Sequence, residues 1–507
     1  MSPLSVRAHG QACIFRLQLG PYAIGEWVGN ILREKYAVCQ FRVTIAAFQT
    51  SNVRIGAVRE IGLSADELVA SLLSLGESER ICILDSCGVG HLGSHLLIAG
   101  LRPVESIQLS SERPQEALQI LDEKFCGDKA AIFTISYDFG LELQNIRVAS
   151  QLTDIFSEPD IYLALFDVLV IHNYRTGASF LSGNASYFSE TERLLAHRTT
   201  EHAAPTSTSA AISNFSRSEY ISAIETIKEF IRTGDTYQTN LTQQIRVQLS
   251  KETKAKDIFW RLRKNHPAPF AAYISRNDSI VVSASPERFF KVSRPCKSEN
   301  PAITDLGSCI FASPIKGTRR RGRTIDEDEL LKNELLESEK DRAENTMIVD
   351  LLRNDVGRVC EFGSVEVDKL CELEAYPTLF HLVSAVSGEL RPETKFSEIL
   401  GATFPCGSIT GAPKIRTMEI ISEFETANRG LSMGAIGCYI PPEFGFFDSV
   451  FDLNVAIRTM VIHEREAVFN VGGGITIDSD PGSEYDETLL KAKALLNAIG
   501  ARFESRA

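Results

Sequence analysis

Residues 467–488 of the chain read AVFNVGGGITIDSDPGSEYDET. The alternation of apolar and polar residues from Ala467 to Ile477 predicts a strand, and this strand contains three successive glycines. The segment that follows carries leucines at helical spacing, so we expect the last helix to begin with Ser483 as its N-cap and to end at Gly500. Three bare backbone N–H groups could line an anion site, but a bulge or a close packing contact explains such glycines equally well.

Helical and strand-like patterns continue toward the N-terminus. Apolar residues at helical spacing predict a helix from Tyr220 to Arg232, and an acidic segment predicts one long helix from Asp326 to about Asn354. Short apolar runs such as Ile81–Leu84 and Ala131–Ile135 indicate strands.

A stretch of small and polar residues, AAPTSTSAAISNFS at 203–216, is typical of a linker. We therefore expect an N-terminal region over residues 1–200, a linker over 201–217 and a second part over 218–497.

The composition is that of a globular protein and argues against several functional classes. The 507 residues suggest two to four domains at about 150 residues each. A net charge of −13 disfavours a general nucleic-acid-binding surface. No apolar run is long enough to span a membrane, and the start of the chain lacks the pattern of a secretory signal. Eleven scattered cysteines without a CxxC pair disfavour disulfides and a zinc site, so we expect a cytoplasmic protein.

Two motifs are each typical of a known kind of binding site, but the residues around them do not fit that kind of site. Residues 88–93 read GVGHLG, but Pro103 follows too soon for the helix that a dinucleotide site needs, so we predict a glycine-rich turn. The arginine run at 319–323 is followed by four acidic residues at 326–329, so we expect a solvated, ion-paired loop.

Several carboxylates and one lysine are candidates for chemistry. Glu344 lies in the long predicted helix, and Glu484 and Glu487 stand three positions apart at the start of the last helix. Carboxylates from separate helices suit Mg²⁺, although spacing alone favours ordinary surface charge. Lys316 stands in the neutral stretch SPIKGT, where a partly desolvated lysine could become a nucleophile. Glu287, within SPERF, is either a positioned acid or a Glu–Arg pair on a turn.

Seven ordered motifs together make the chain similar to the chorismate-utilising enzymes. They are GDTYQTNLT (234–242), SPERF (285–289), PIKGT (314–318), DRAENTMIVDLLRND (341–355), FPCGSITGAPK (404–414), AIRT (456–459) and GGGITIDSDPGSEYDET (472–488). The resemblance covers residues 218–497, which would make this part the catalytic one. It implies an α+β fold in which two large antiparallel sheets pack as a sandwich with helices outside, and in which the N-terminal region contributes strands.

The resemblance also implies a reaction. Members that aminate chorismate at C4 carry a lysine where this chain has Lys316, whereas anthranilate synthases carry a small residue there. Members that use water as the nucleophile carry a lysine base where this chain has Gln238. We therefore expect conversion of chorismate and ammonia to 4-amino-4-deoxychorismate, the precursor of 4-aminobenzoate and folate. Anthranilate synthase or isochorismate synthase-like activity is the alternative, and a chorismate-binding protein without turnover is an alternative of another class.

Roles for individual residues follow from the resemblance. Lys316 would attack C2 of chorismate to form a covalent adduct, and Glu287 would protonate the leaving C4 hydroxyl. Mg²⁺ would be held by Glu344, Glu484 and Glu487. The residues expected to bind the substrate are Gly317, Thr318, Tyr439, Arg458, Gly472, Gly473 and Gly474. The family usually has Gly-Tyr where this chain has Gly437-Cys438-Tyr439, so either Cys438 or Tyr439 would face the substrate.

Partners beyond chorismate are implied as well. A separate glutamine amidotransferase subunit would supply ammonia. Ser86, Pro269, Phe270 and Ala271 match the walls of a tryptophan pocket in relatives, and bound tryptophan is left open here. The segment 293–311 is longer than the hairpin of the family, so it would either reach the site or be disordered.

Overall fold

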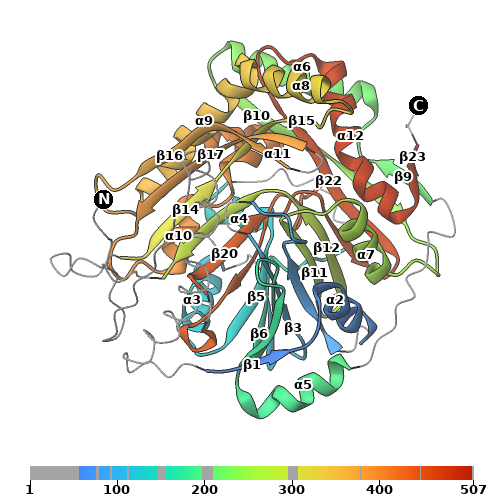
Figure 1. Ribbon diagram of the computed structural model, residues 1–507. Helices are drawn as coiled ribbons and strands as arrows, with labels where there is room; N and C mark the ends of the chain where they lie inside the picture. The colour runs from blue at the N-terminus through green and yellow to red at the C-terminus, as the bar shows by residue number, and fades with distance from the viewer. Residues whose placement is uncertain are drawn as a thin grey trace, which may run out of the picture. The chain divides into compact units, whose positions relative to one another are not determined.

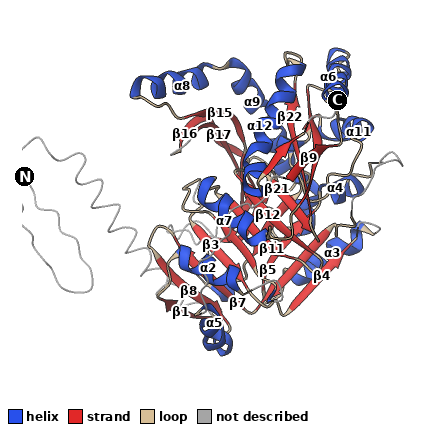
Figure 2. Cartoon of the chain, turned by 90° about the vertical axis from the view of Figure 1, so that its right-hand side faces the viewer, coloured by secondary structure: helices blue, strands red, loops and turns tan. Residues whose placement is uncertain are grey.

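The computed structural model describes residues 56–75, 79–91, 94–110, 113–146, 156–196, 209–294, 307–376, 379–445 and 447–504. Their strands form two large sheets, with helices on the outer faces (Figures 1 and 2). The α+β fold with two packed sheets is therefore confirmed.

The first sheet contains thirteen strands. In spatial order these are β1 (Ala57–Ile61), β8 (Ala178–Gly183), β7 (Val168–Asn173), β3 (Leu96–Gly100), β2 (Cys82–Asp85), β11 (Phe270–Ser275), β12 (Ser279–Ser285), β21 (Thr459–His463), β22 (Glu466–Ile475), β10 (Gln238–Gln248), β9 (Ser209–Ser213) and β23 (Ala501–Phe503), with β18 (Gly411–Ala412) also paired to β10. The pairs are antiparallel except that β23 and β9 run parallel.

The second sheet contains ten strands. In spatial order these are β15 (Ile315–Arg320), β17 (Leu379–Glu389), β14 (Cys309–Ser313), β13 (Arg288–Ser293), β20 (Ser449–Val455), β19 (Ala435–Tyr439), β5 (Ala130–Ile135), β6 (Ile161–Phe166) and β4 (Glu105–Leu109), with β16 (Glu366–Ala375) on the other side of β17. The hairpin arms β13 and β14 are described, whereas 295–306, most of the expected long insertion, lies outside the described residues.

Side chains alternate along the strands between two apolar layers. In β12, Val281 belongs to the cluster between the sheets, whereas Val282 lies under the helices of the first sheet. In β5, Ile132 faces the other sheet and Phe133 lies under the helices of the second. Each sheet is therefore buried on both faces, which explains why short strands such as Ala131–Ile135 read as unbroken apolar runs.

The helices cover the outer faces. They are α2 (Ala65–Ser74), α3 (Pro114–Lys124), α4 (Tyr137–Leu143), α5 (Phe188–Leu195), α6 (Arg217–Arg232), α7 (Ala255–Asn265), α8 (Ile325–Glu337), α9 (Glu339–Gly357), α10 (Phe396–Thr403), α11 (Lys414–Phe424) and α12 (Pro481–Ile499). Residues of α2, α5, α7 and α12 pack on the first sheet, and residues of α3, α4 and α10 pack on the second. Helices α8 and α9 pack on β15 and β17 and lie at the top of the view in Figure 2.

Two predicted helix boundaries are wrong. The long acidic helix is interrupted at Ser338, which ends α8 and whose hydroxyl accepts the Asp341 N–H to begin α9. The last helix begins three residues earlier than expected, because Asp480 is the N-cap and accepts from the Ser483 N–H. Its end at Gly500 is confirmed, since this residue adopts a left-handed conformation with φ of 83°.

The N-terminal part of the described chain extends the same sheets as the rest. Strand β2 pairs with β11, and β5 pairs with β19. Within the expected linker, Ser209–Ser213 form β9, which pairs with β10. The division into 1–200, 201–217 and 218–497 stays a prediction, but part of the linker is a strand of the first sheet.

The glycine-rich motif at 88–93 and the arginine run at 319–323 both lie in local structures that need no ligand. After Gly88 (φ 70°) the chain enters strand β3 rather than a helix, as expected for a turn outside a dinucleotide site. Arg320 and Arg321 pair with Glu327 and Asp328, which confirms the ion-paired interpretation. In the described part of the chain, no helix is both long and apolar enough to cross a membrane.

Candidate active site

Lys316 and Thr318 are placed by an irregularity in β15. Lys316 is opposite Leu382 of β17, and Thr318 is opposite His381, so the intervening Gly317 forms a bulge. Gly317 has φ of 70°, and a Cβ there would lie 2.8 Å from Leu335 Cδ1, which explains the glycine between the two functional residues.

Glu287 is a buried carboxyl group beside Lys316. It lies between β12 and β13 and is 5% exposed, with Ser408 and the backbone of Ile315 beside it. Burial raises the pKa of Glu287, and the charge of Lys316 opposes this shift. Lys316 Nζ donates to Ser408 O at 3.4 Å, while Glu287 Oε1 has no hydrogen-bond partner. An amine and a protonatable acid therefore face the same loop, with one acid oxygen left for a ligand.

Thr318, His381 and Arg458 form a second polar group. Thr318 Oγ1 and His381 Nδ1 lie 2.9 Å apart. Burial, followed by the charge of Arg458, lowers the pKa of His381 to about 4, so this imidazole is neutral at pH 7. Burial alone lowers the pKa of Arg458, whose φ of 48° places it in the left-handed region. The structure records no carboxylate paired with this guanidinium among the described residues, so Arg458 is suited to bind an anionic group of a ligand.

The three predicted metal-binding glutamates come from two helices, and each faces a lysine. Lys340 Nζ lies 3.5 Å from Glu484 Oε1 and 3.9 Å from Glu344 Oε1. Lys491 Nζ lies 2.9 Å from Glu487 Oε1. Burial raises the pKa of Glu344. Although burial acts to raise it, the pKa of Glu487 is lowered by Lys491 and then by Lys340.

Lysine side chains share the space of the three glutamates. Within the described ranges, no three His, Cys, Asp or Glu side chains are arranged to hold a metal ion. The ammonium groups of Lys340 and Lys491 lie among these carboxylates, and the binding of Mg²⁺ by the three glutamates stays a prediction. The carboxylate oxygens nevertheless suit Mg²⁺, which commonly binds one or two protein carboxylates together with water and an anionic substrate.

The three glycines belong to β22, where β10 pairs with them in regular register. A Cβ at Gly473 would lie 3.2 Å from Glu484 Oε2, and a Cβ at Gly474 would overlap Gln238 Nε2 at 2.0 Å. Gly472 O accepts from Lys491 Nζ at 2.9 Å. The glycines thus keep the space beside Glu484 and Gln238 free of side chains.

Tyr439 is placed away from this site, which corrects its expected role in substrate binding. Its hydroxyl donates to Gly127 O at 3.1 Å, and its ring packs against Phe125 and Phe451. Cys438 points to the opposite face of β19, into a cavity between the sheets. Neither residue touches the side chains around Lys316, because the Lys316 strand is at the far end of the second sheet from β19.

The cavity that Cys438 lines also contains the residues of the expected tryptophan pocket. Ser86, Pro269, Phe270 and Ala271 line its wall, and its volume is about 80 Å³. The Ser86 hydroxyl is buried and has no hydrogen-bond partner. The sequence therefore grouped these four residues correctly, and the identity of an occupant stays a prediction.

The sequence profile of chorismate binding enzymes matches residues 83–497. The chain belongs to this family. Aminodeoxychorismate synthase component 1 of Bacillus subtilis is 35% identical to this family member over 382 residues, which are 73% of this chain and 76% of the relative. Anthranilate synthase component 1 of Aquifex aeolicus is 36% identical over 365 residues, which are 68% of this chain and 70% of that one.

Other relatives differ more in length or sequence. The chloroplastic aminodeoxychorismate synthase of Arabidopsis thaliana is 41% identical over 286 residues, which are 56% of this chain but only 29% of the plant protein. The crystal structure of anthranilate synthase component I from Streptococcus pneumoniae covers 80% of this family member and 93% of its own chain, with a TM-score of 0.68 and 26% identity.

His381 and Ser408 are site residues that sequence reasoning missed. His381 occupies one position in an apolar strand, and nothing in its local pattern distinguishes it from a core histidine. Ser408 lies inside the motif FPCGSITGAPK at 404–414, but only the fold brings its main-chain and side-chain oxygens to Lys316 and Glu287.

Proposed function

We propose that this protein is an aminodeoxychorismate synthase that replaces the C4 hydroxyl of chorismate with an amino group. The observation that supports this proposal most directly is the placement of Lys316 beside the buried, protonatable Glu287. A lysine nucleophile needs a neighbouring acid here because hydroxide is a poor leaving group. The relatives named aminodeoxychorismate synthase support the same assignment.

Lys316, Glu287 and ammonia account for every bond and proton in the proposed reaction. The neutral amine of Lys316 attacks C2, the ring double bonds shift, and the C4–O bond breaks as Glu287 gives its proton to the departing oxygen, which leaves as water. Ammonia then attacks C4, the double bonds shift back, and the C2–N bond to Lys316 breaks. The Glu287 carboxylate takes the proton that the new C4 amine releases, which restores both residues.

Chorismate has two carboxylates, and the site offers two places for them. Arg458, with Thr318 and His381 beside it, would hold one carboxylate by charge and hydrogen bonds. Glu344, Glu484 and Glu487 would hold Mg²⁺, whose charge would bind the other carboxylate and polarise the substrate ring. Gly473 keeps the space beside Glu484 open for such an ion.

The remaining assignments concern partners and location. A glutamine amidotransferase subunit is the proposed source of ammonia. The cavity of Ser86, Phe270 and Cys438 would take tryptophan, and its unpartnered Ser86 hydroxyl offers a polar contact for an amino acid. A cytoplasmic location fits the described cysteines, all of which are free.

The proposed function is tested by product analysis. Purified protein with chorismate, Mg²⁺ and ammonium chloride should yield 4-amino-4-deoxychorismate, identified by liquid chromatography and mass spectrometry. Lys316→Ala should abolish this product or divert it to anthranilate, whereas Lys332→Ala, which removes a partly exposed lysine of α8 paired with Glu329, should leave the product unchanged. Isochorismate from the intact protein would contradict the assignment.

Anthranilate synthase is the second candidate, because relatives with this name match the chain at similar identity. The same assay separates the two functions. Anthranilate as the main product of the intact protein would support this candidate and would remove Lys316 from the role of a covalent nucleophile.

A further inference from the structure

Lys340 stands where a cation is needed between two glutamates from different helices. Its ammonium lies 3.5 Å from Glu484 Oε1 on α12 and 3.9 Å from Glu344 Oε1 on α9. Both carboxylates are largely buried, with side-chain exposures of 7% and 16%, whereas the Lys340 side chain is 52% exposed. The partly exposed ammonium of Lys340 therefore neutralises the largely buried carboxylates of Glu344 and Glu484.

The surroundings of the two carboxylates explain why a counter-ion is required. Asp341 and Glu484 add to the burial that raises the pKa of Glu344, so the two glutamates disfavour each other as anions. Glu484 has another partner, since its Oε1 accepts from the Ser479 hydroxyl at 2.6 Å, but this bond supplies no charge. Among the described residues, Lys340 is the cation that lies within 4.0 Å of both carboxylates. The charge of Lys316 also acts to lower the pKa of Glu344, and Lys491 is engaged by Glu487 and Gly472 O.

The position of Lys340 on its helix allows it to leave. It lies in the first turn of α9, four residues before Glu344, so its flexible chain reaches back over the helix toward Glu484. The ammonium can return to solvent without a change in the backbone, whereas the glutamates cannot follow it because their helices are packed on the sheets.

We infer that Lys340 is a built-in counter-ion that occupies the cation position of the metal-free protein and is displaced from Glu484 when Mg²⁺ binds. This inference rests on the proposed Mg²⁺ site. Its consequence is that the ammonium competes with the metal, so the lysine stabilises the empty site and weakens metal binding.

The inference is tested by Mg²⁺ titration in the absence of chorismate. Isothermal titration calorimetry should give Lys340→Met a dissociation constant for Mg²⁺ about fivefold or more below that of the intact protein, as expected for removal of a partly exposed ion pair. The melting temperature of this variant without metal should fall, and Mg²⁺ should raise it more than it raises that of the intact protein. Lys332→Met, which removes a lysine of α8 that pairs with Glu329 instead of Glu344 or Glu484, should leave both quantities unchanged.

A second measurement uses the intact protein and does not depend on the folding of a variant. Acetylation of lysines, followed by peptide mass spectrometry, should label Lys340 faster with Mg²⁺ than without it, because displacement exposes the amine. Equal labelling, or an Mg²⁺ affinity of Lys340→Met that is unchanged or weaker, would overturn the inference.

The controls separate this inference from the metal site itself. If the intact protein binds Mg²⁺ and Glu484→Gln does not, the site is present, and an unchanged Lys340→Met variant rejects the lysine's role alone. If the intact protein binds no Mg²⁺, both the site and the inference fail, while the product assay still decides the reaction.

Discussion

Glu287 is a carboxyl group that the fold buries beside an amine, and this makes it sensitive to pH. Only the protonated acid can assist departure of the C4 hydroxyl, and burial raises its pKa. The rate of the intact enzyme should therefore fall as pH rises through the pKa of Glu287. Glu287→Gln should lower kcat about 10²- to 10⁴-fold and remove this alkaline decline. The measurement is a pH–rate profile with ammonium chloride, in which the concentration of free ammonia is held constant at each pH.

Ionisation of Glu287 should also lower the stability of the folded protein. Because the folded protein binds the Glu287 proton more tightly than the unfolded chain, stability falls as pH rises from the ordinary glutamate pKa to the raised one. Glu287→Gln should therefore raise the melting temperature more at pH 8 than at pH 5. Glu229→Gln, at an exposed position on α6 paired with Arg232, should change neither rate nor stability appreciably. A Glu287→Gln variant with an unaltered pH–rate profile would exclude Glu287 as the acid.

Residues that lie together in the site were predictable from the sequence where a motif fixes the residue type, while their roles stay predictions. Lys316, Glu287, Thr318 and Arg458 were found in this way, and the fold gathers them. Tyr439 was misassigned because its neighbour Cys438 shares the same strand, and alternation alone does not say which face of that strand a site occupies. His381 was missed because its importance comes from burial beside Arg458, which depends on contacts between distant segments.

At the level of elements, the break between α8 and α9 is the clearest departure from expectation. The acidic segment has continuous helical spacing, but Ser338 takes an extended conformation and caps α9 through the Asp341 N–H at 3.2 Å. A serine side chain competes for local backbone groups, so it can start a new helix within a helical pattern. Such a cap cannot be distinguished from an exposed serine within a helix by periodicity.

Removal of this cap gives a prediction for α9. Ser338→Ala should lower the free energy of unfolding by about 1 kcal/mol, because one N–H of the first turn loses its acceptor. Urea denaturation followed by circular dichroism is the measurement. Ser338→Asp retains an acceptor and a negative charge at the helix N-terminus, so it should keep the stability of the intact protein. If Ser338→Ala and Ser338→Asp were equally destabilised, the hydroxyl would not be the relevant group.

For the whole molecule, the family motifs predicted two packed sheets, but local patterns could not give the strand order. Strand β2 is inserted between β3 and β11, and the chain separates β2 from β11 by more than 180 residues. The small and polar composition of 203–216 favoured a linker, yet Ser209–Ser213 join the first sheet because β10 and β23 offer paired edges on both sides. Non-local pairing of this kind overrides local composition.

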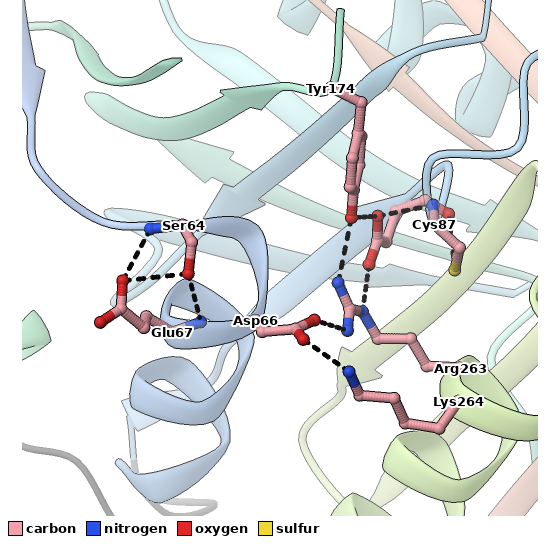
Figure 3. A network of polar contacts seen from close by, with 8 residues as sticks. Ser64, Asp66, Glu67, Cys87, Tyr174, Arg263 and Lys264 are labelled. Carbon is pink, nitrogen blue, oxygen red and sulfur yellow. Dashed lines mark hydrogen bonds and ion pairs between the residues drawn. The ribbon is translucent and has the colours of Figure 1, made fainter. Parts of the chain in front are cut away.

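A buried ion pair joins the two sequence halves of the first sheet. Figure 3 shows Arg263 of α7 among Asp66, Lys264 and Tyr174. Its Nε donates to Asp85 at the end of β2 at 2.6 Å, and the Asp85 side chain is fully buried. Asp85→Leu should therefore lower the free energy of unfolding by about 3–5 kcal/mol, because it leaves the buried guanidinium with one carboxylate partner, the exposed Asp66.

The double variant Asp85→Leu/Arg263→Met tests the cause of this lower free energy of unfolding. The cause is either the unpaired charge of Arg263 or the loss of the contact between residues 85 and 263. Since an apolar pair of similar volume removes the desolvation penalty, the double variant should regain much of the stability that Asp85→Leu loses. Trp260, whose ring lies 5.8 Å from the Arg263 guanidinium carbon, reports unfolding of this region by fluorescence. The matched surface pair Arg59–Glu192 should contribute about 0–1 kcal/mol, so Glu192→Leu is the control. If Asp85→Leu were no more destabilising than Glu192→Leu, the attachment of β2 to the rest of the sheet would depend on strand pairing and apolar packing alone.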